Sequence, residues 1–307
     1  MILNYCLKRA VEIVLVLWLL SIIVFLLIRL LPGDPAQVIA GLGATADEVE
    51  ALRVKLGLHL PFYVQYVRWL GSVFKGDLGS SAITGEAINK LIIYRLWNTT
   101  KLAIIGLFLA VVLGIVFGTL SAVYHNTIID YGLTVIATIG ISMPIFMIGL
   151  FLMWLFALRW QVLPAAGTGG LRYIILPSLT IAGYSTPFIV RMTRASLLEV
   201  LRQDFIRTAE AKGLASHQVI VIHGLRNAAV EIITVIGLQF GTLMGGAVLT
   251  ESVFDWSGLG RLLVDAVFKR DYPLVQGLLL IFGGIFAFTN FLVDITYGFL
   301  DPRVVYE

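Results

Sequence analysis

The sequence has little charge and almost no cysteine. Asp, Glu, Lys and Arg make up 13% of the 307 residues, 59% are hydrophobic, and the mean hydropathy is +0.93. This composition lies outside that of soluble globular proteins and is typical of a membrane protein. The single cysteine, Cys6, cannot form a disulfide within the chain, and the four histidines lack the spacing of a structural zinc site. Neither redox chemistry nor a bound metal is therefore expected.

Catalytic motifs are missing as well. The chain contains no G-x-x-x-x-G-K-[ST] phosphate loop, no H-E-x-x-H and no G-x-S-x-G. The acidic residues Asp130, Glu251 and Asp294 lie near the ends of apolar runs, where snorkelling or capping is expected. Because no ionisable group lies deeper, a proton-driven carrier is disfavoured. A net charge of +3 without blocks of like charge gives no sign of nucleic-acid binding.

Long apolar runs are what the sequence does contain. Six stretches lack Asp, Glu, Lys and Arg: 13–28, 102–129, 131–158, 173–190, 232–250 and 272–293. A helix needs about 20 apolar residues to cross roughly 30 Å of hydrocarbon, and lipid offers no partner to unpaired backbone groups. The sequence therefore predicts an all-α integral membrane protein with six transmembrane helices. The first run is expected to be a retained span, because no small-residue cleavage pattern closely follows it.

Lys and Arg set the predicted orientation. They are more frequent in the segments that are internal when the N-terminus is inside, so both termini are predicted to be cytoplasmic. The predicted divisions are an N-terminal transmembrane helix (1–32), an external helical segment (33–100), a five-span core (101–300) with a cytoplasmic loop at about 197–228, and a cytoplasmic tail (301–307). In the external segment, Thr45–Glu48 fits a capping box, and Tyr66, Trp69 and Val73 share one face of a short helix.

Proline and glycine interrupt three of the apolar runs. Pro144 falls in the third run, Pro177 and Pro187 are expected to bracket the fourth, and glycines recur at every fourth position in the fifth. A row of small residues at this spacing lets another backbone approach closely. Two interpretations stay open, which are packing within one bundle and the lining of a translocation pathway or subunit interface. The residues concerned are Ser142, Pro144, Gly237, Gly241 and Gly245.

One charged segment, Arg191–Glu231, interrupts the apolar chain on the predicted cytoplasmic side. Its pattern predicts a helix near Leu197–Lys212, a break at Gly213 and a second helical stretch over roughly Ser216–Arg226. The break is expected because glycine adopts a left-handed φ without steric cost. This helix pair has too little apolar area to fold alone, so it must dock on something. In active transport, another subunit would have to supply energy through this surface.

The same segment, "DFIRTAEAKGLASHQVIVIHGLRNA", resembles the cytoplasmic EAA loop of membrane permeases of bacterial ATP-binding-cassette (ABC) importers for peptides, nickel and related solutes. Ala209, Gly213 and Leu225 fall on the pattern positions of that loop. Arg207 and Thr208 replace its first Glu and Ala. Further segments follow the order of the family: "RLLPGDPA", "LGLHLPFYVQYVRWL", "GDLGSS", "GISMPIF", "VLPAAG", "ILPSLT", "GLGRLLVDAV" and "RDYPLVQG". The resemblance therefore covers nearly the whole chain.

The resemblance implies a type I importer permease fold and the first of two permease subunits, in the bacterial inner membrane. It implies alternating access with a second permease, two ATPase subunits that bind ATP and Mg, and an extracytoplasmic solute-binding protein. The chain itself would be non-catalytic and would bind no cofactor, metal or nucleic acid. Contact with the ATPases is expected at Arg207, Thr208, Ala209, Glu210, Lys212, Gly213 and Leu225. The family usually has proline after Trp256, and this chain has Ser257.

The solute is left open between two classes. "HGLRNA", "GLQFG", "GLGRLLVD" and "RDYP" look closest to permeases for glutathione and short peptides, and a nickel or metal-chelate permease of the same family is the alternative. A channel or secondary carrier that needs no ATPase would also explain six spans, and a membrane scaffold or sensor would explain the external segment. Neither explains the ordered set of family segments.

Overall fold

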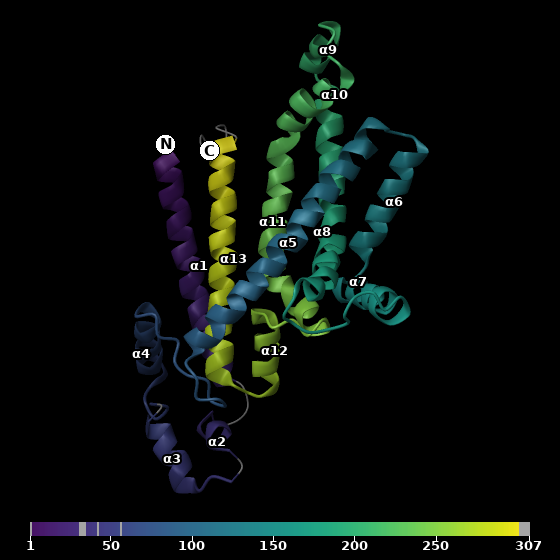
Figure 1. Ribbon diagram of the computed structural model, residues 1–307. Helices are drawn as coiled ribbons and strands as arrows, with labels where there is room; N and C mark the ends of the chain where they lie inside the picture. The colour runs from purple at the N-terminus through teal and green to yellow at the C-terminus, as the bar shows by residue number, and fades with distance from the viewer. Residues whose placement is uncertain (1, 31–34, 42, 56, 301–307) are drawn as a thin grey trace.

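The computed structural model describes residues 2–30, 35–41, 43–55 and 57–300, and within them the fold is built from helices (Figure 1). The long helices are α1 (Ile2–Leu30), α5 (Ile88–Val123), α8 (Leu171–Val200), α11 (Arg226–Val253) and α13 (Tyr272–Leu300). The shorter elements are α2 (Pro35–Ala40), α3 (Ala46–Lys55), α4 (Phe62–Phe74), α6 (Ile128–Ser142), α7 (Ile145–Leu152), the π-helical η1 (Met153–Arg159), α9 (Asp204–Ala211), α10 (Ser216–Gln218), the π-helical η2 (Val219–Leu225) and α12 (Leu259–Phe268).

Five of the described helices are long and apolar enough to cross a membrane. The pair of α6 with α7 and η1 makes a sixth span when it is counted as one broken crossing, and it bends by 106° at the break. Pro144 lies in this break, as the residue that precedes α7. The predicted all-α membrane fold is confirmed, with the third predicted span as the one that is bent.

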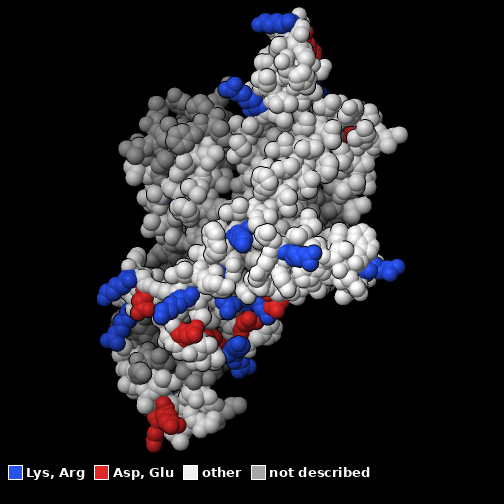
Figure 2. All heavy atoms as spheres, in the orientation of Figure 1, with Lys and Arg blue, Asp and Glu red and all other residues white. Residues whose placement is uncertain are grey.

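The two ends of the molecule differ in what they carry. The start of α1 and the end of α13 lie at the same end as α9 and α10, whereas α2, α3, α4 and α12 lie at the opposite end (Figure 1). We call these the α9 end and the α12 end. Charged side chains gather towards both ends, and the face between them in Figure 2 is almost free of charge. Such a charge-poor band suits contact with lipid.

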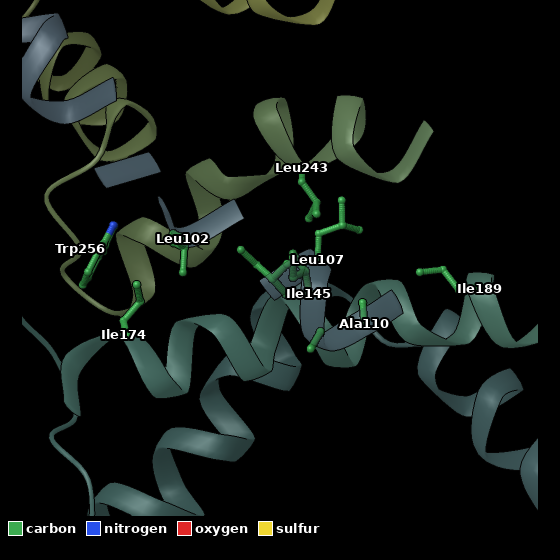
Figure 3. Close-up of a cluster of buried hydrophobic side chains, with 10 residues drawn as sticks. Leu102, Leu107, Ala110, Ile145, Ile174, Ile189, Leu243 and Trp256 are labelled. Carbon is green, nitrogen blue, oxygen red and sulfur yellow. The ribbon is translucent and has the colours of Figure 1, made fainter. Parts of the chain in front are cut away.

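A row of small residues on α5 brings this helix close to α8. A Cβ atom added at Gly106 would lie 2.5 Å from Ile181, and one at Gly114 would lie 2.5 Å from Ile189. These glycines are therefore required for the close approach of the two helices. The core around this contact also includes Leu102, Leu107, Ala110, Ile145, Ile174, Leu243 and Trp256 (Figure 3).

The external segment forms the two short helices that the sequence indicates. The capping box before α3 is confirmed, because the Thr45 backbone N–H donates to Glu48 at 2.8 Å and the Glu48 N–H donates to the Thr45 hydroxyl at 3.4 Å. On α4, Tyr66 and Trp69 pack against Phe25 of α1, with ring centroids 5.2 and 5.8 Å apart. The Tyr66 hydroxyl also lies 2.8 Å from that of Ser21. These contacts fix α4 to the C-terminal half of α1.

Several predicted boundaries are wrong. The span predicted over the charge-free run 102–129 is α5, which begins earlier, at Ile88, and ends at Val123. A turn at residues 124–127 separates α5 from α6, and it contains Asn126 in a left-handed conformation, φ 61°. The predicted division between residues 100 and 101 therefore falls inside a helix.

Pro177 and Pro187 do not bracket the fourth span, because both lie inside α8. Neighbouring helices can tolerate such prolines inside a membrane bundle. Pro187 packs against α6, where a Cβ atom on Gly140 would lie 2.6 Å from the proline ring. The predicted tail at 301–307 lies outside the described residues.

Candidate functional site

The charged segment forms a hairpin at the α9 end. Residues near Leu197 belong to the last turns of α8, so the first predicted helix is in fact two, α8 and α9 with a turn between them. The second predicted stretch comprises α10 and η2, which continue without a break into α11. The hairpin is thus an extension of two membrane-spanning helices, and not a separate helix pair. A displacement of its tip can therefore reach both α8 and α11.

The first helix of this hairpin, α9, buries one face and exposes the other. Ile206 and Ala209 are buried with Val219 of η2, and Val200 and Leu201 at the end of α8 pack against them. The residues of α9 that remain exposed are Asp204, Phe205, Arg207, Thr208, Glu210 and Ala211. The small apolar contact holds α9 in place and leaves a surface of mixed polarity for a partner.

A glycine turn ends α9. Gly213 has φ +80°, its N–H donates to the Glu210 carbonyl at 2.9 Å, and the Leu214 N–H donates to the Ala209 carbonyl at 3.4 Å. These two bonds form a Schellman motif, in which glycine is preferred. No atom lies within 4 Å of a Cβ added at Gly213. The requirement for glycine is therefore set by the backbone, and another residue would cost about 1–2 kcal/mol there.

The structure brings together six of the seven residues predicted to contact the ATPases. Arg207, Thr208, Ala209, Glu210, Lys212 and Gly213 lie on α9 and its terminal turn, and all of them except Ala209 are exposed. The Thr208 hydroxyl donates to the Asp204 carbonyl at 2.9 Å. Leu225 is half-buried at the end of η2 that is remote from Gly213. Their contact with an ATPase stays a prediction.

The residues predicted for the pathway fall into two groups. Ser142 and Pro144 are exposed at the bend between α6 and α7, where a partner or solute could reach them. By contrast, a Cβ atom on Gly237 would overlap Val293, and one on Gly241 would lie 3.4 Å from Asn290. Both contacts are with α13 of the same chain, so packing within the bundle accounts for these two glycines. Gly245 lies on α11, and its surroundings are outside the described residues.

Comparison with known families identifies the chain. Residues 114–306 match the family described as "Binding-protein-dependent transport system inner membrane component", and residues 2–89 match the N-terminal region of such membrane components. The chain belongs to this family. It is therefore a multi-pass inner-membrane permease subunit of an ABC transporter, as the EAA-like segment led us to expect.

Relatives and solved structures agree with this assignment. The permease is 41% identical to a probable peptide ABC transporter permease, y4tP, from Sinorhizobium fredii strain NGR234, over 98% of this chain and 99% of the relative. It is 40% identical to the glutathione transport system permease GsiC of Escherichia coli K12, over 99% and 100%. A chain of the inward-facing MetNI methionine ABC transporter matches with TM-score 0.60 and 18% identity, over 69% and 96%. This last match supports the type I permease fold.

Sequence analysis missed the tertiary role of two acidic residues in the permease. Asp130 is 2% exposed and Glu251 is 0% exposed, so neither reaches water by snorkelling. Asp130 instead accepts two hydrogen bonds from Arg194 of α8. The available signals were an isolated acidic residue, Asp130, at the start of one span and the arginines near the matching end of another.

Glu251 caps a helix other than its own. It accepts from the Thr99 hydroxyl at 2.6 Å and from the backbone N–H groups of Gly260 and Arg261 at 2.7 and 3.1 Å. The last two groups lie in the first turn of α12, where a carboxylate is favoured. A Cβ atom on Gly258 would overlap the Glu251 carboxylate, so glycine is required there. Capping is thus the correct interpretation for Glu251, although it acts on α12.

Ser257 forms two backbone hydrogen bonds, and proline could form only one of them. Its backbone N–H donates to the Thr168 hydroxyl at 2.9 Å, and its carbonyl accepts from the Asn98 side chain at 2.9 Å. Proline has no N–H to donate. The Trp256 indole N–H donates to the Asn98 carbonyl at 3.1 Å, which adds a second tie between this loop and α5. The loop is therefore held on both sides with serine in place of proline.

Two further family segments meet at the α12 end. Asp271, from "RDYPLVQG", is 2% exposed and accepts from the Ala82 N–H at 3.0 Å and from the Ser81 hydroxyl. Ser81 ends the segment "GDLGSS". The buried carboxylate ties the external segment to the start of α13. Among the described residues, no group of three His, Cys, Asp or Glu side chains is placed to hold a metal ion.

Proposed function

We propose that this permease is one of two pathway-forming subunits of an ATP-driven importer for short peptides or glutathione. The observation that carries the proposal is the match of about 40% identity over almost the whole chain to permeases named for peptides and for glutathione. These names favour that class over nickel or metal chelates. The solute would be delivered by an extracytoplasmic binding protein at the α12 end, and both termini would lie in the cytoplasm.

The α9 end supplies the surface for energy transfer. Two ATPase subunits would bind ATP and Mg, and one would contact the exposed face of α9 and the turn at Gly213. Its motion would pass through Ile206 and Ala209 to α8, and through η2 to α11. Alternating access needs an element with two arrangements that both ligands bias, and two permeases rocking against each other provide one. The chain itself would perform no catalysis and bind no cofactor.

The test is reconstitution of the complex. The tagged chain is extracted in mild detergent, the proteins that co-purify are identified by mass spectrometry, and the assembly is placed in liposomes with its binding protein. We expect a second permease and two ATPase polypeptides, or two copies of one, and uptake of labelled glutathione or dipeptide only with ATP. A folded chain that purifies alone and passes solute without ATP would be a channel or carrier instead. ATP-driven uptake of nickel alone would assign the other solute class.

A further inference from the structure

A buried ion pair joins three helices near the α9 end. Asp130, in the first turn of α6, accepts from Arg194 Nε at 2.7 Å and from Arg194 Nη2 at 2.8 Å. The Ser121 hydroxyl of α5 also donates to Asp130. The carboxylate is 2% exposed, whereas the Arg194 side chain is 28% exposed. A bidentate pair of this kind fixes both position and orientation.

The turn between α5 and α6 takes part in the same cluster. The Asn126 backbone N–H donates to Asp130 Oδ2 at 3.0 Å, and His125 Nδ1 lies 3.2 Å from that oxygen and 3.1 Å from Arg194 Nη2. This ring nitrogen can accept from Arg194 or, when protonated, donate to Asp130, but it cannot do both. We call Ser121, His125, Asp130 and Arg194 the α8 clamp.

Net stability is a weak explanation for the clamp. Replacement of a buried ion pair by apolar side chains of similar volume is often neutral or stabilising, whereas removal of one partner leaves an uncompensated charge. The α5–α6 hairpin is already packed on α8, at Gly114 against Ile189 and at Gly140 against Pro187. What the ion pair adds is a directional link between one point on α8 and one point on α6.

We call residues 204–225, from α9 to the end of η2, the coupling hairpin, and Arg194 lies one turn from its contacts with α8. Leu197, three residues after Arg194, is 0% exposed, and a Cβ atom on Gly224 of η2 would lie 2.8 Å from it. The next turn of α8 packs against Ile206 and Ala209 of α9. A continuous chain of contacts therefore runs from α9 through the end of α8 to Arg194, and from there to Asp130.

Arg194 also borders a cavity. It lies in the wall of a cavity of about 540 Å³ that is lined by residues of α6, α8 and α11, among them Thr134, Phe188, Arg191, Met192 and Val235. The guanidinium therefore has free volume into which it can move when α8 and α6 separate. A link that can close on Asp130 or open into a cavity has the two arrangements that a coupling element needs.

We propose that Asp130 and Arg194 are positioning residues that transmit motion of the coupling hairpin to α6 and to the exposed bend at Ser142 and Pro144. The inference rests on the proposed function, because it assumes that a partner moves α9. Without the clamp, only packing contacts such as that of Gly140 with Pro187 link α6 to α8, so α6 follows the end of α8 less closely. Hydrolysis by the ATPases then continues while the bend fails to respond.

The first test measures uptake and ATP hydrolysis in the reconstituted complex. We expect Asp130→Asn and Arg194→Gln each to lower solute uptake per ATP about tenfold, with hydrolysis within about twofold of wild type. The double variant is expected to be no worse than either single one, because both remove the same link. Arg191→Gln is the matched control. It removes the same charge one turn before Arg194, and Arg191 forms no ion pair with another described residue.

Conservative and exchanged variants separate positioning from folding. Arg194→Lys keeps the charge and loses the bidentate geometry, so an intermediate ratio is expected. Exchange of the two residues, Asp130→Arg with Arg194→Asp, should restore part of the uptake per ATP. Three outcomes would overturn the proposal. Uptake and hydrolysis could fall equally in all variants, the losses could add in the double variant, or Arg191→Gln could lower uptake per ATP as much as Arg194→Gln does.

A second test does not depend on the identity of the solute. Spin labels are placed at Ile128 on α6, which is 90% exposed, and at Glu199 on α8, in a Cys6→Ser background of the complete complex. In the wild-type background, the distance distribution between the labels should stay unchanged when ATP and vanadate are added, and in Asp130→Asn it should shift or broaden. Identical behaviour in both backgrounds would refute the clamp even if ATP-driven peptide uptake is demonstrated. Failure of uptake with the expected distance change would instead refute the proposed solute.

Discussion

The hairpin of residues 204–225 at the α9 end and the loops at the α12 end of this permease are held in different ways. At the α9 end, the coupling hairpin is anchored by Ile206, Ala209 and Val219, and its tip is exposed. At the α12 end, the buried carboxylates of Glu251 and Asp271 accept several hydrogen bonds from three separate parts of the chain. A weakly held surface can respond to a partner, whereas a bonded network resists deformation. The comparison predicts that the hairpin moves more easily than the network at the α12 end.

The largest loss of stability is expected when the hydrogen bonds of Glu251 at the α12 end are removed. Glu251→Ala would leave the Thr99 hydroxyl and the N–H groups of Gly260 and Arg261 without an acceptor. Each unsatisfied buried group costs about 1–3 kcal/mol, so the variant should lose about 3 kcal/mol or more of stability. Thermal unfolding in detergent, followed by size-exclusion chromatography, measures the loss. Glu199→Ala, at an exposed site on α8, is the control, and equal melting temperatures for the two variants would contradict the network.

At the α9 end, a substitution in the hairpin turn should lower the coupling of uptake to ATP hydrolysis and leave folding intact. Gly213→Pro is incompatible with φ +80° and removes the N–H that bonds to Glu210. We expect uptake per ATP to fall about tenfold while the amount of folded protein is maintained. Gly76→Pro is the matched control. Gly76 lies at the α12 end, has φ +77° and has open space around its Cβ position. Unchanged uptake in Gly213→Pro would remove the hairpin from the coupling route.

A smaller effect is expected in the loop before α12. Ser257→Pro removes the N–H donor to Thr168 and should lower stability by about 1 kcal/mol, with uptake retained. Ser257→Ala keeps that N–H and loses only the side-chain hydroxyl, which accepts from Thr168 at 3.0 Å, so it is the control for loss of the side chain. Thr168→Val removes the same acceptor, so its effect should not add to that of Ser257→Pro. Fully additive changes in melting temperature would show that this hydrogen bond contributes nothing.

The smallest effect concerns α3 in the external segment. The Thr45 backbone N–H and hydroxyl, which donate to Glu48, hold the pKa of that carboxyl below its ordinary value. The capping box therefore stabilises α3 above the pKa that Glu48 has in the unfolded chain, and this contribution is lost as the pH falls through the lowered value. Backbone hydrogen exchange of residues 46–55, corrected for intrinsic rates, should rise slightly in acid. Glu48→Gln should abolish the pH dependence, and its persistence would contradict the assignment.

Local features of the two ends could be predicted from the sequence, and contacts between helices could not. The turn at Gly213 and the capping box at Thr45 depend on neighbouring residues, so spacing alone indicates them. The pairing of Asp130 with Arg194 joins residues on different helices, and hydropathy carries no information about that contact. Charge-free runs located the spans but not their exact ends, because the turn at Asn126 contains no Asp, Glu, Lys or Arg to mark it.

The most direct test of the account is hydrogen exchange of the intact complex with and without ATP and vanadate. We expect the protection of residues 204–225 to change when the ATPases close, and that of residues 251–260 to stay constant. This result would establish a responsive α9 end and a rigid α12 end. A change confined to residues 251–260, with the coupling hairpin unaffected, would contradict the account.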